Sequence, residues 1–412
     1  MSLWEGLTPL HSGASHTLSE GYRTKGQSQM YTTKKVKYDK TSEFDMLAHE
    51  SGRCYSKIVS LMRKVKRKKG FWLSQGAVQK YMRLRCYKLH SQTVQSIIQS
   101  YFDSLKSYFQ IVKRNPEAKP PNRTPHFYKV RWIQNGITFK DGVIRLSNGR
   151  GNSSITLKSD AKPAYVEMYF QQGSYYFSLV YKVQVPPKLE TGKAVAIDMG
   201  EIHPIVSHDG EHTIIYNGRV LRAIKQYLNK FKAHIQSKMD RCKQRSNHWY
   251  RLKRIKTKIL AKLDAQIQDA EHKITSRFIS DCIKAKADTI VMGDLKGIRK
   301  RAKFSKKSNQ KEHQWAFARL QSMICYKAEL AGLTIKFVSE AYSSQTCPTC
   351  GNRKKPTNRN YKCNHCGFQY HRDGVGAINI WNKVSGFLLS PVVGVMASPI
   401  GVRFHPHLCK SG

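Results

Sequence analysis

Two Cys-x-x-Cys pairs near the carboxyl end constrain the fold of this 412-residue chain more than any other feature. The pairs are Cys347 with Cys350 and Cys363 with Cys366, and 12 residues separate them. Four thiolates at this spacing suit tetrahedral zinc, and a glycine follows each pair, where a tight turn is needed. The sequence therefore predicts a zinc ribbon over 347–368 with one structural Zn²⁺, whose closed coordination shell leaves no catalytic position.

The net charge of the chain indicates a polyanionic partner. Lys and Arg number 72 and Asp and Glu number 27, which gives a formal charge of +45. Such a surplus disfavours a small-molecule enzyme and favours nucleic acid, while 40% apolar residues exclude a disordered basic tail. The uncharged segment 386–402 is short and contains two prolines, and no stretch has the pattern of a secretory signal. We expect no membrane partner and a cytoplasmic location, in a prokaryotic cytosol or nucleoid.

The N-terminal half reads as strands interrupted by helices. Residues 1–29 lack periodicity and are expected to form a disordered or loose extension. Short alternating segments over 30–43 and 123–188 predict a small β-barrel. The segment 44–122 carries apolar residues at three- and four-residue steps and is predicted to be a helical insertion in that barrel.

Two strongly basic segments lie in the predicted helical regions. Six of the seven residues over 63–69 are basic, in a run expected between helices, and residues 221–263 contain 14 Lys/Arg against one acidic residue. Charges of one sign at this density repel without counterions, which favours phosphate contacts over a merely solvated face. The candidate phosphate contacts are Lys64, Lys66, Arg67, Arg251, Lys253 and Arg254.

Two aspartates mark a candidate catalytic site in the C-terminal half. An α/β domain is predicted over 189–346 and 369–385, with buried strands in the segments AVAID, TIVMGDL and TIKFVSE. Asp198 ends the first strand, and Asp373 opens a helix-like run directly after the ribbon. Two-metal cleavage of a phosphodiester needs converging carboxylates, which parallel strands can supply at their carboxyl ends. An Asp at a strand end is often only a cap, so each residue alone is a weak signal.

Four motifs in the C-terminal half give the sequence a family resemblance. AIDMG, VMGDLKGIR, SSQTCPTCG and YKCNHCGFQYHRDGVGAINI follow the order of the RuvC-like segments of TnpB, most densely over 190–382. The chain thus resembles the insertion-sequence-encoded, RNA-guided nucleases that are similar to ancestors of type V CRISPR effectors. The resemblance implies a multidomain α+β protein. It would have a wedge β-barrel with an inserted helical recognition lobe, and an RNase H-like (RuvC-like) α/β nuclease domain carrying the zinc ribbon.

One position departs from the family pattern. The family places a Glu just before the Asp-Leu pair of the second segment, where this sequence has Gly293. Glu340 ends the next predicted strand and is the favoured replacement, because a neighbouring parallel strand can present an acid to the same metals. Glu201 and Asp294 are further candidates, and a site without a third acid stays open. A surface ion pair is the competing explanation for Glu340.

The resemblance implies a set of cofactors and partners. Two catalytic Mg²⁺ ions would be held by Asp198, Glu340 and Asp373. A transposon-derived guide RNA would pair with one strand of double-stranded DNA beside a short flanking motif. Gln75, Gln79 and Lys80 are candidates for base-edge contacts in that motif. The oligomeric state stays open, and the tail 386–412 has no assigned function.

Several other functions compete with guided cleavage. A nuclease-dead, RNA-guided DNA-binding repressor is favoured by Gly293 but disfavoured by the retained Asp198, Asp373 and complete ribbon. A transposon-derived CRISPR effector of the same fold stays open. A transposase of the RNase H class fits less well because its acids follow a different order. A generic RNA binder explains the charge but not the acids at strand ends.

Overall fold

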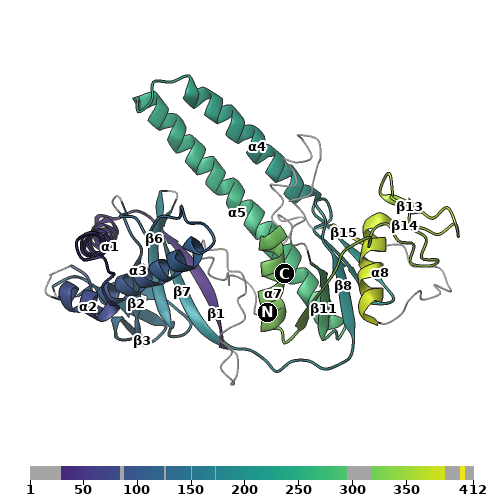
Figure 1. Ribbon diagram of the computed structural model, residues 1–412, viewed down its shortest axis with the longest axis horizontal. Helices are drawn as coiled ribbons and strands as arrows, with labels where there is room; N and C mark the ends of the chain where they lie inside the picture. Colours follow the sequence, from purple (N-terminus) through teal and green to yellow (C-terminus); the bar gives the residue numbers. More distant parts are fainter. Residues whose placement is uncertain are drawn as a thin grey trace. The chain divides into compact units, whose positions relative to one another are not determined.

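The computed structural model describes residues 29–83, 88–124, 127–149, 151–171, 173–294, 317–385 and 400–403. The chain divides into two compact units, one ending at Gln184 and one beginning at Val185, and each is described by itself (Figure 1). The expectations for residues 1–28, for the basic run 296–311 and for most of the tail 386–412 lie outside the described residues.

The first unit contains two antiparallel sheets. Its strands are β1 (Gln29–Tyr38), β2 (Val130–Ile133), β3 (Ile137–Lys140), β4 (Val143–Leu146), β5 (Ile155–Lys158), β6 (Tyr165–Gln171) and β7 (Ser174–Gln184). One sheet has the order β1-β7-β6-β2 and the other β3-β4-β5. The strand predicted near residue 30 does join strands more than a hundred residues away, since β1 pairs with β7 from Gln29 to Tyr38. The observed pairings give two sheets, and closure into a wedge barrel stays a prediction.

Three helices pack on these sheets: α1 (Ser42–Lys69), α2 (Gln75–Arg83) and α3 (Ser91–Val112). The hydroxyl of Thr41 caps α1, and Gly70, at φ 76°, ends it in the left-handed conformation. The expectation that the basic run 63–69 lies between helices is wrong, because these residues form the last turns of α1. Basic side chains are favourable there, since the carboxyl end of a helix carries partial negative charge.

The second unit is built on a six-stranded mixed sheet with the order β12-β11-β8-β9-β10-β15. Its strands are β8 (Ala194–Asp198), β9 (Ile205–His208), β10 (Thr213–Asn217), β11 (Thr289–Gly293), β12 (Thr334–Val338) and β15 (Ile400–Arg403). β8, β11 and β12 run parallel, whereas β9 pairs antiparallel with both β8 and β10. β12 was expected to be buried but is half-exposed, because it forms an edge of the sheet. β15, in the tail, was not expected at all.

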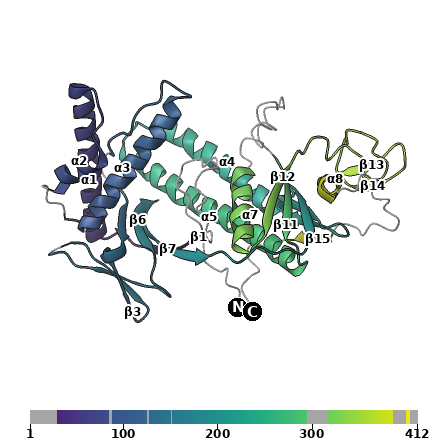
Figure 2. The same cartoon turned by 60° about the horizontal axis from the view of Figure 1, so that its bottom comes forward.

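Helices cover both faces of this sheet (Figures 1 and 2). The described helices of this unit are α4 (Arg219–Asp240), α5 (Asn247–Lys284), α7 (Phe317–Leu330) and α8 (Arg372–Ser385), of which α4 packs on α5 away from the sheet (Figure 1). Ile197 and Met292 pack in one buried cluster with side chains of α5 and α7. Ala196 and Val291 pack on the opposite face against Ile380 of α8. Because side chains alternate along a strand, positions 198 and 293 fall on the α8 face.

The long helical stretch predicted after residue 220 is a hairpin of α4 and α5 (Figure 1). Leu221 and Ile267 pack together near its base, and Ile235 and Leu252 pack near its tip. The buried carboxylate of Glu271 pairs with cations from neighbouring helices and ties the base together. Within the described ranges, none of the helices combines the length and apolarity needed to cross a membrane.

His208 in β9 gives the second unit a pH-dependent stability. Its ring packs edge-on against Trp381, with ring centroids 5.8 Å apart, and its Nδ1 lies 3.0 Å from Thr213 Oγ1. Burial lowers the pKa of His208 to about 4, although the Asp209 carboxylate acts in the other direction. Because the unfolded chain binds this proton more readily, the free energy of unfolding should fall as the pH drops from about 6.5 to about 4.

We expect this loss to reach about 3 kcal/mol, at about 1.4 kcal/mol per unit of pKa difference. Urea unfolding at a series of pH values measures it. His208→Asn should flatten the dependence in that window, whereas His212→Asn, at an exposed neighbouring histidine, should keep it. Equal pH dependence in the two variants would show that His208 is not the group responsible.

Candidate functional site

The candidate site begins with a row of residues at the carboxyl ends of three parallel strands. Met292 of β11 pairs with Ile197 of β8, so the next position along each strand places Gly293 beside Asp198. On its other side Gly293 pairs with Val338 of β12. Asp198, Gly293 and Val338 therefore form one row on the face of the sheet that α8 covers (Figure 1).

Glu340 lies directly over Gly293. A Cβ atom at position 293 would come within 1.8 Å of Glu340 Cγ and 1.9 Å of its Oε1. The side chain of Glu340 thus fills the space that any side chain at position 293 would need. Its Oε1 is buried and has no hydrogen-bond partner among the described residues, and such an orphaned acceptor suits a cation ligand.

Helix α8 approaches Asp198 from the other side. Asp373 lies in its first turn, and Gly376, three residues later, shares its helix face. A Cβ atom at position 376 would come within 2.4 Å of Asp198 Oδ2, so this glycine permits the close approach. Asp198 therefore has both other predicted acids as neighbours whose charges act on it, although the groups of possible ligand atoms within 4.8 Å of one another, among the described residues, include Asp373 but not Asp198 or Glu340.

The electrostatics of these acids reflect their proximity. Burial first, then the carboxylates of Glu340 and Asp373, raises the pKa of Asp198 to about 8. Burial also raises the pKa of Glu340 to about 7, although Lys383 acts in the other direction. Two neighbouring buried carboxylates repel each other when both are ionised, and a cation bound between them removes this repulsion. Carboxylate oxygens are ligands that Mg²⁺ prefers, so this donor set fits a divalent ion.

Asp373 already has three side-chain partners. His203 Nδ1 lies 2.8 Å from Asp373 Oδ2, Arg359 Nη1 lies 2.6 Å from the same oxygen, and Arg372 Nη2 lies 3.2 Å from Oδ1. Burial raises the pKa of this carboxyl, but the His203 hydrogen bond and the two arginines outweigh it and hold the pKa far below its usual range. Sequence analysis missed His203 and both arginines. Arg372 precedes Asp373 in the quoted motif, but no sequence signal links His203 or Arg359 to it.

A second group of possible metal ligands adjoins the acids. His203, His371 and Asp373 place one ligand atom each within 4.8 Å of the others. The guanidinium of Arg359 contacts both Asp373 Oδ2 and His203 Nδ1, the latter at 3.3 Å. A protein cation therefore occupies this place.

The other candidate acids are placed differently. Glu201 forms an ion pair with Arg222, with Oε1 and Nε 3.3 Å apart. Asp294 is exposed, and its backbone N–H extends the pairing of β11 with Val338. Glu340 is the candidate whose side chain lies over the row of strand ends.

The four predicted zinc ligands come together in one cluster. Cys347 Sγ lies 3.6 Å from Cys366 Sγ, and Cys350 Sγ lies 3.5 Å from Cys363 Sγ. Sulfur atoms at the corners of a tetrahedral zinc site are about 3.8 Å apart, so the cluster fits this ion. The strands β13 (Asn360–Lys362) and β14 (Gln369–His371) support it.

The predicted nucleic-acid contacts are mostly exposed and are divided between the two units. Lys64, Lys66 and Arg67 lie on the last turns of α1, Gln79 and Lys80 lie on α2, and Arg251, Lys253 and Arg254 lie on α5. Gln75 Nε2 instead donates to Gln99 Oε1 at 2.8 Å, so its amide is already engaged. The Lys253 ammonium lies 4.9 Å from the centre of the Trp249 ring.

Removal of one sulfur ligand should release the zinc. We expect about one zinc per purified chain by elemental analysis, and a large loss of zinc in Cys363→Ser. Because Val375 of α8 packs in the same cluster as the ribbon cysteines, this variant should also unfold at lower urea. Cys242→Ser, outside the cluster, should keep its zinc. Full zinc content in Cys363→Ser would contradict the assignment.

Two family models match the second half of the chain. The model OrfB_IS605, described as "Probable transposase", matches residues 178–299, which include Asp198 and Gly293. The TNB domain of Cas12f1-like proteins matches residues 317–380, which include Glu340, the four cysteines and Asp373.

Two curated relatives agree with these models. A TnpB-like protein of Methanocaldococcus jannaschii is 32% identical over 182 residues, which cover 43% of this chain and 63% of that protein. The CRISPR-associated endodeoxyribonuclease Cas12f2 of a Micrarchaeota archaeon is 27% identical over 223 residues, which cover 51% of this chain and 40% of that protein. The chain thus spans less than two thirds of the length of either relative.

The fold resembles that of a solved Cas12f1 complex with sgRNA and target DNA. The TM-score is 0.58 at 15% identity, and the match covers 82% of this chain and 81% of the other. At this identity the likeness shows the fold alone, which is the multidomain α+β fold of a type V effector. The family models and the curated relatives show that the chain is similar to TnpB and Cas12f proteins.

Proposed function

We propose that this chain is an RNA-guided DNA endonuclease whose active site consists of Asp198, Glu340 and Asp373. The observation that carries the proposal is the side chain of Glu340 in the space above Gly293, beside Asp198. The family models support it, because the matched residues 178–299 and 317–380 hold these acids, and relatives of the chain are named as Cas12f endodeoxyribonucleases. The strand order of the second unit supports a RuvC-like domain of the RNase H class.

The three acids would hold two Mg²⁺ ions. Bound there, the ions would activate water and stabilise the leaving oxygen of a phosphodiester. Asp198 and Glu340 would supply buried oxygens for them, and the pairing of β8, β11 and β12 would fix the spacing of the two carboxylates. His203 orients Asp373 through its Nδ1 and keeps this carboxylate ionised. The guanidinium of Arg359 would move from Asp373 when an ion binds.

A guide RNA and double-stranded target DNA are the proposed partners. The excess of basic side chains, a net charge of +45, can neutralise phosphates of the RNA and the DNA. The exposed basic ends of α1 and α5 carry the candidate phosphate contacts. Sequence choice would come from pairing with the guide, and Gln79 and Lys80 are exposed near the predicted flanking-motif surface. We place the protein in the prokaryotic cytosol or nucleoid.

A nuclease-dead repressor is the second candidate function. The absence of an acid at Gly293 and the pairing of Asp373 with Arg359 favour it. Such a protein would bind guide-matched DNA without cutting it. The intact acids at the other positions favour cleavage, because a repressor would not need a buried, orphaned carboxylate oxygen at Glu340.

Plasmid cleavage tests the proposed function. The full chain, co-expressed with its flanking transposon-end RNA, should cut a plasmid with a guide-matched target beside a randomised flank. Cleavage should need Mg²⁺, be prevented by EDTA and select one short flanking motif. Binding without cleavage would favour the repressor over the nuclease. If the chain neither binds nor cleaves the target, both proposed functions are wrong.

An exchange of the acid tests the role of Glu340. Glu340→Ala should lower cleavage by more than about 100-fold, because loss of a metal ligand costs more than loss of its supporting contacts. The double variant Gly293→Glu, Glu340→Ala should recover much of the activity, since it returns a carboxylate to the same space. Gly293→Ala alone should lower cleavage, because its Cβ would displace Glu340.

Matched controls accompany this exchange. Glu201→Ala removes another acid near Asp198 in sequence and should retain near-parental cleavage. Each variant is also measured for RNA-guided binding to the target, which should change little. Full cleavage in Glu340→Ala would show that the site works without this acid.

A further inference from the structure

The helical hairpin of the second unit contains a groove that the proposed active site does not use. Its volume is about 500 Å³, and it lies between α4 and α5. Its lining combines apolar and polar side chains, among them Ala223, Ile224, Tyr227, Ile259, Lys262 and Gln266. Apolar walls with a few polar groups are typical of a binding site for a flat, partly polar ligand.

Tyr227 gives the groove an aromatic platform. Tyr227 is 56% exposed. Its ring stacks against Phe231 of the same helix, with centroids 6.4 Å apart and planes inclined by 29°. The ring is thus supported from one side and open on the other, which suits the stacking of a planar group.

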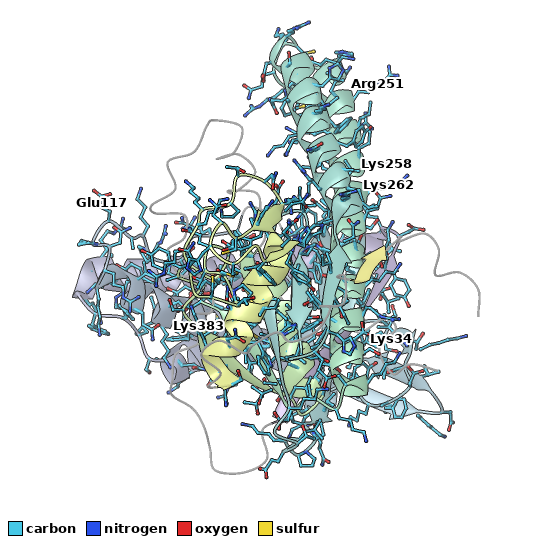
Figure 3. The ribbon with its side chains drawn as sticks, turned by 90° about the vertical axis from the view of Figure 1, so that its right-hand side faces the viewer. Lys34, Glu117, Arg251, Lys258, Lys262 and Lys383 are labelled. Atoms are coloured by element: carbon cyan, nitrogen blue, oxygen red, sulfur yellow. The ribbon has the colours of Figure 1, made fainter. Side chains whose placement is uncertain are left out.

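A row of cations leads along the hairpin to this groove. Arg251, Lys258 and Lys262 are spaced by seven and four residues, so they share one face of α5. Figure 3 shows them one after another along the same side of the hairpin. They span about 16 Å of helix. None of the three forms an ion pair with another described side chain, which leaves their charge available to a ligand.

We propose that the groove binds an unpaired base of a single-stranded RNA, stacked on Tyr227, with the adjoining phosphates on Arg251, Lys258 and Lys262. Aromatic platforms beside basic rows bind single strands in this way. RNA is the chosen occupant because its loops present unpaired bases without the energy that opening a DNA duplex requires. The Gln266 amide can bond a base edge or a 2′-hydroxyl. The inference rests on the proposed function only in taking RNA as the partner.

Binding of short RNA to the full chain tests this site without any cleavage. Tyr227→Ala should weaken binding of single-stranded RNA by about 5- to 150-fold, as measured by fluorescence anisotropy. Tyr227→Phe keeps the ring and should stay within about twofold of the parent. Binding of an RNA duplex should not change in either variant.

The salt dependence of RNA affinity distinguishes the phosphate contacts from base stacking. Lys262→Ala should reduce the slope of log affinity against log salt by about 0.7, because one phosphate contact is lost. Tyr227→Ala should leave that slope unchanged. Tyr250→Ala serves as the matched control, because Tyr250 is also exposed on α5 but does not line the groove.

Three outcomes would overturn the inference. Parental RNA affinity in Tyr227→Ala would show that the ring binds no base. Equal loss for single-stranded and duplex RNA would indicate a structural role for Tyr227. A loss confined to single-stranded DNA would identify DNA as the occupant. If plasmid cleavage fails while Tyr227→Ala weakens RNA binding as expected, the nuclease proposal fails and this site remains.

Discussion

The candidate site depends on the missing Cβ atom at Gly293. Parallel pairing of β8, β11 and β12 brings Asp198, Gly293 and Val338 into one row. Because nothing projects from the middle position, Glu340 can fold back over it from beyond the end of β12. With Gly293 the chain lacks a carboxylate at this position. The same glycine leaves the space that the carboxylate of Glu340 fills.

The helix opposite this row is adapted in the same way. Gly376 lets α8 approach Asp198, and the same helix face carries Asp373. Arg359, from the segment between the two cysteine pairs, then contacts Asp373 at 2.6 Å. The zinc cluster and the acids are thus mechanically linked, since the ribbon shares a buried cluster with Val375 of α8. The chain carries a charge of +45, and one of its basic side chains, Arg359, contacts a carboxylate that is proposed to bind a metal ion.

The α4–α5 hairpin differs from an ordinary structural hairpin. It has one buried cluster near its base and another near its tip, and a groove lies between its helices. Exposed Tyr227 and the row from Arg251 to Lys262 add stacking and charge at one surface. This combination suits a flexible, polyanionic strand better than a protein partner, which would favour a continuous apolar face.

Sequence alone determined what depends on local chemistry. The cysteine spacing predicted the sulfur cluster, and an acid at a strand end together with an acid at the start of a helix marked Asp198 and Asp373 as one candidate site. The choice of Glu340 also came from sequence, as an expectation that a neighbouring strand could supply an acid. Only the tertiary structure decided that its side chain lies over Gly293, and that His203 and Arg359 surround Asp373. These contacts join residues 47, 170 and 14 positions apart. Strand register and helix approach set them, and neither is encoded by the residues at the contact itself.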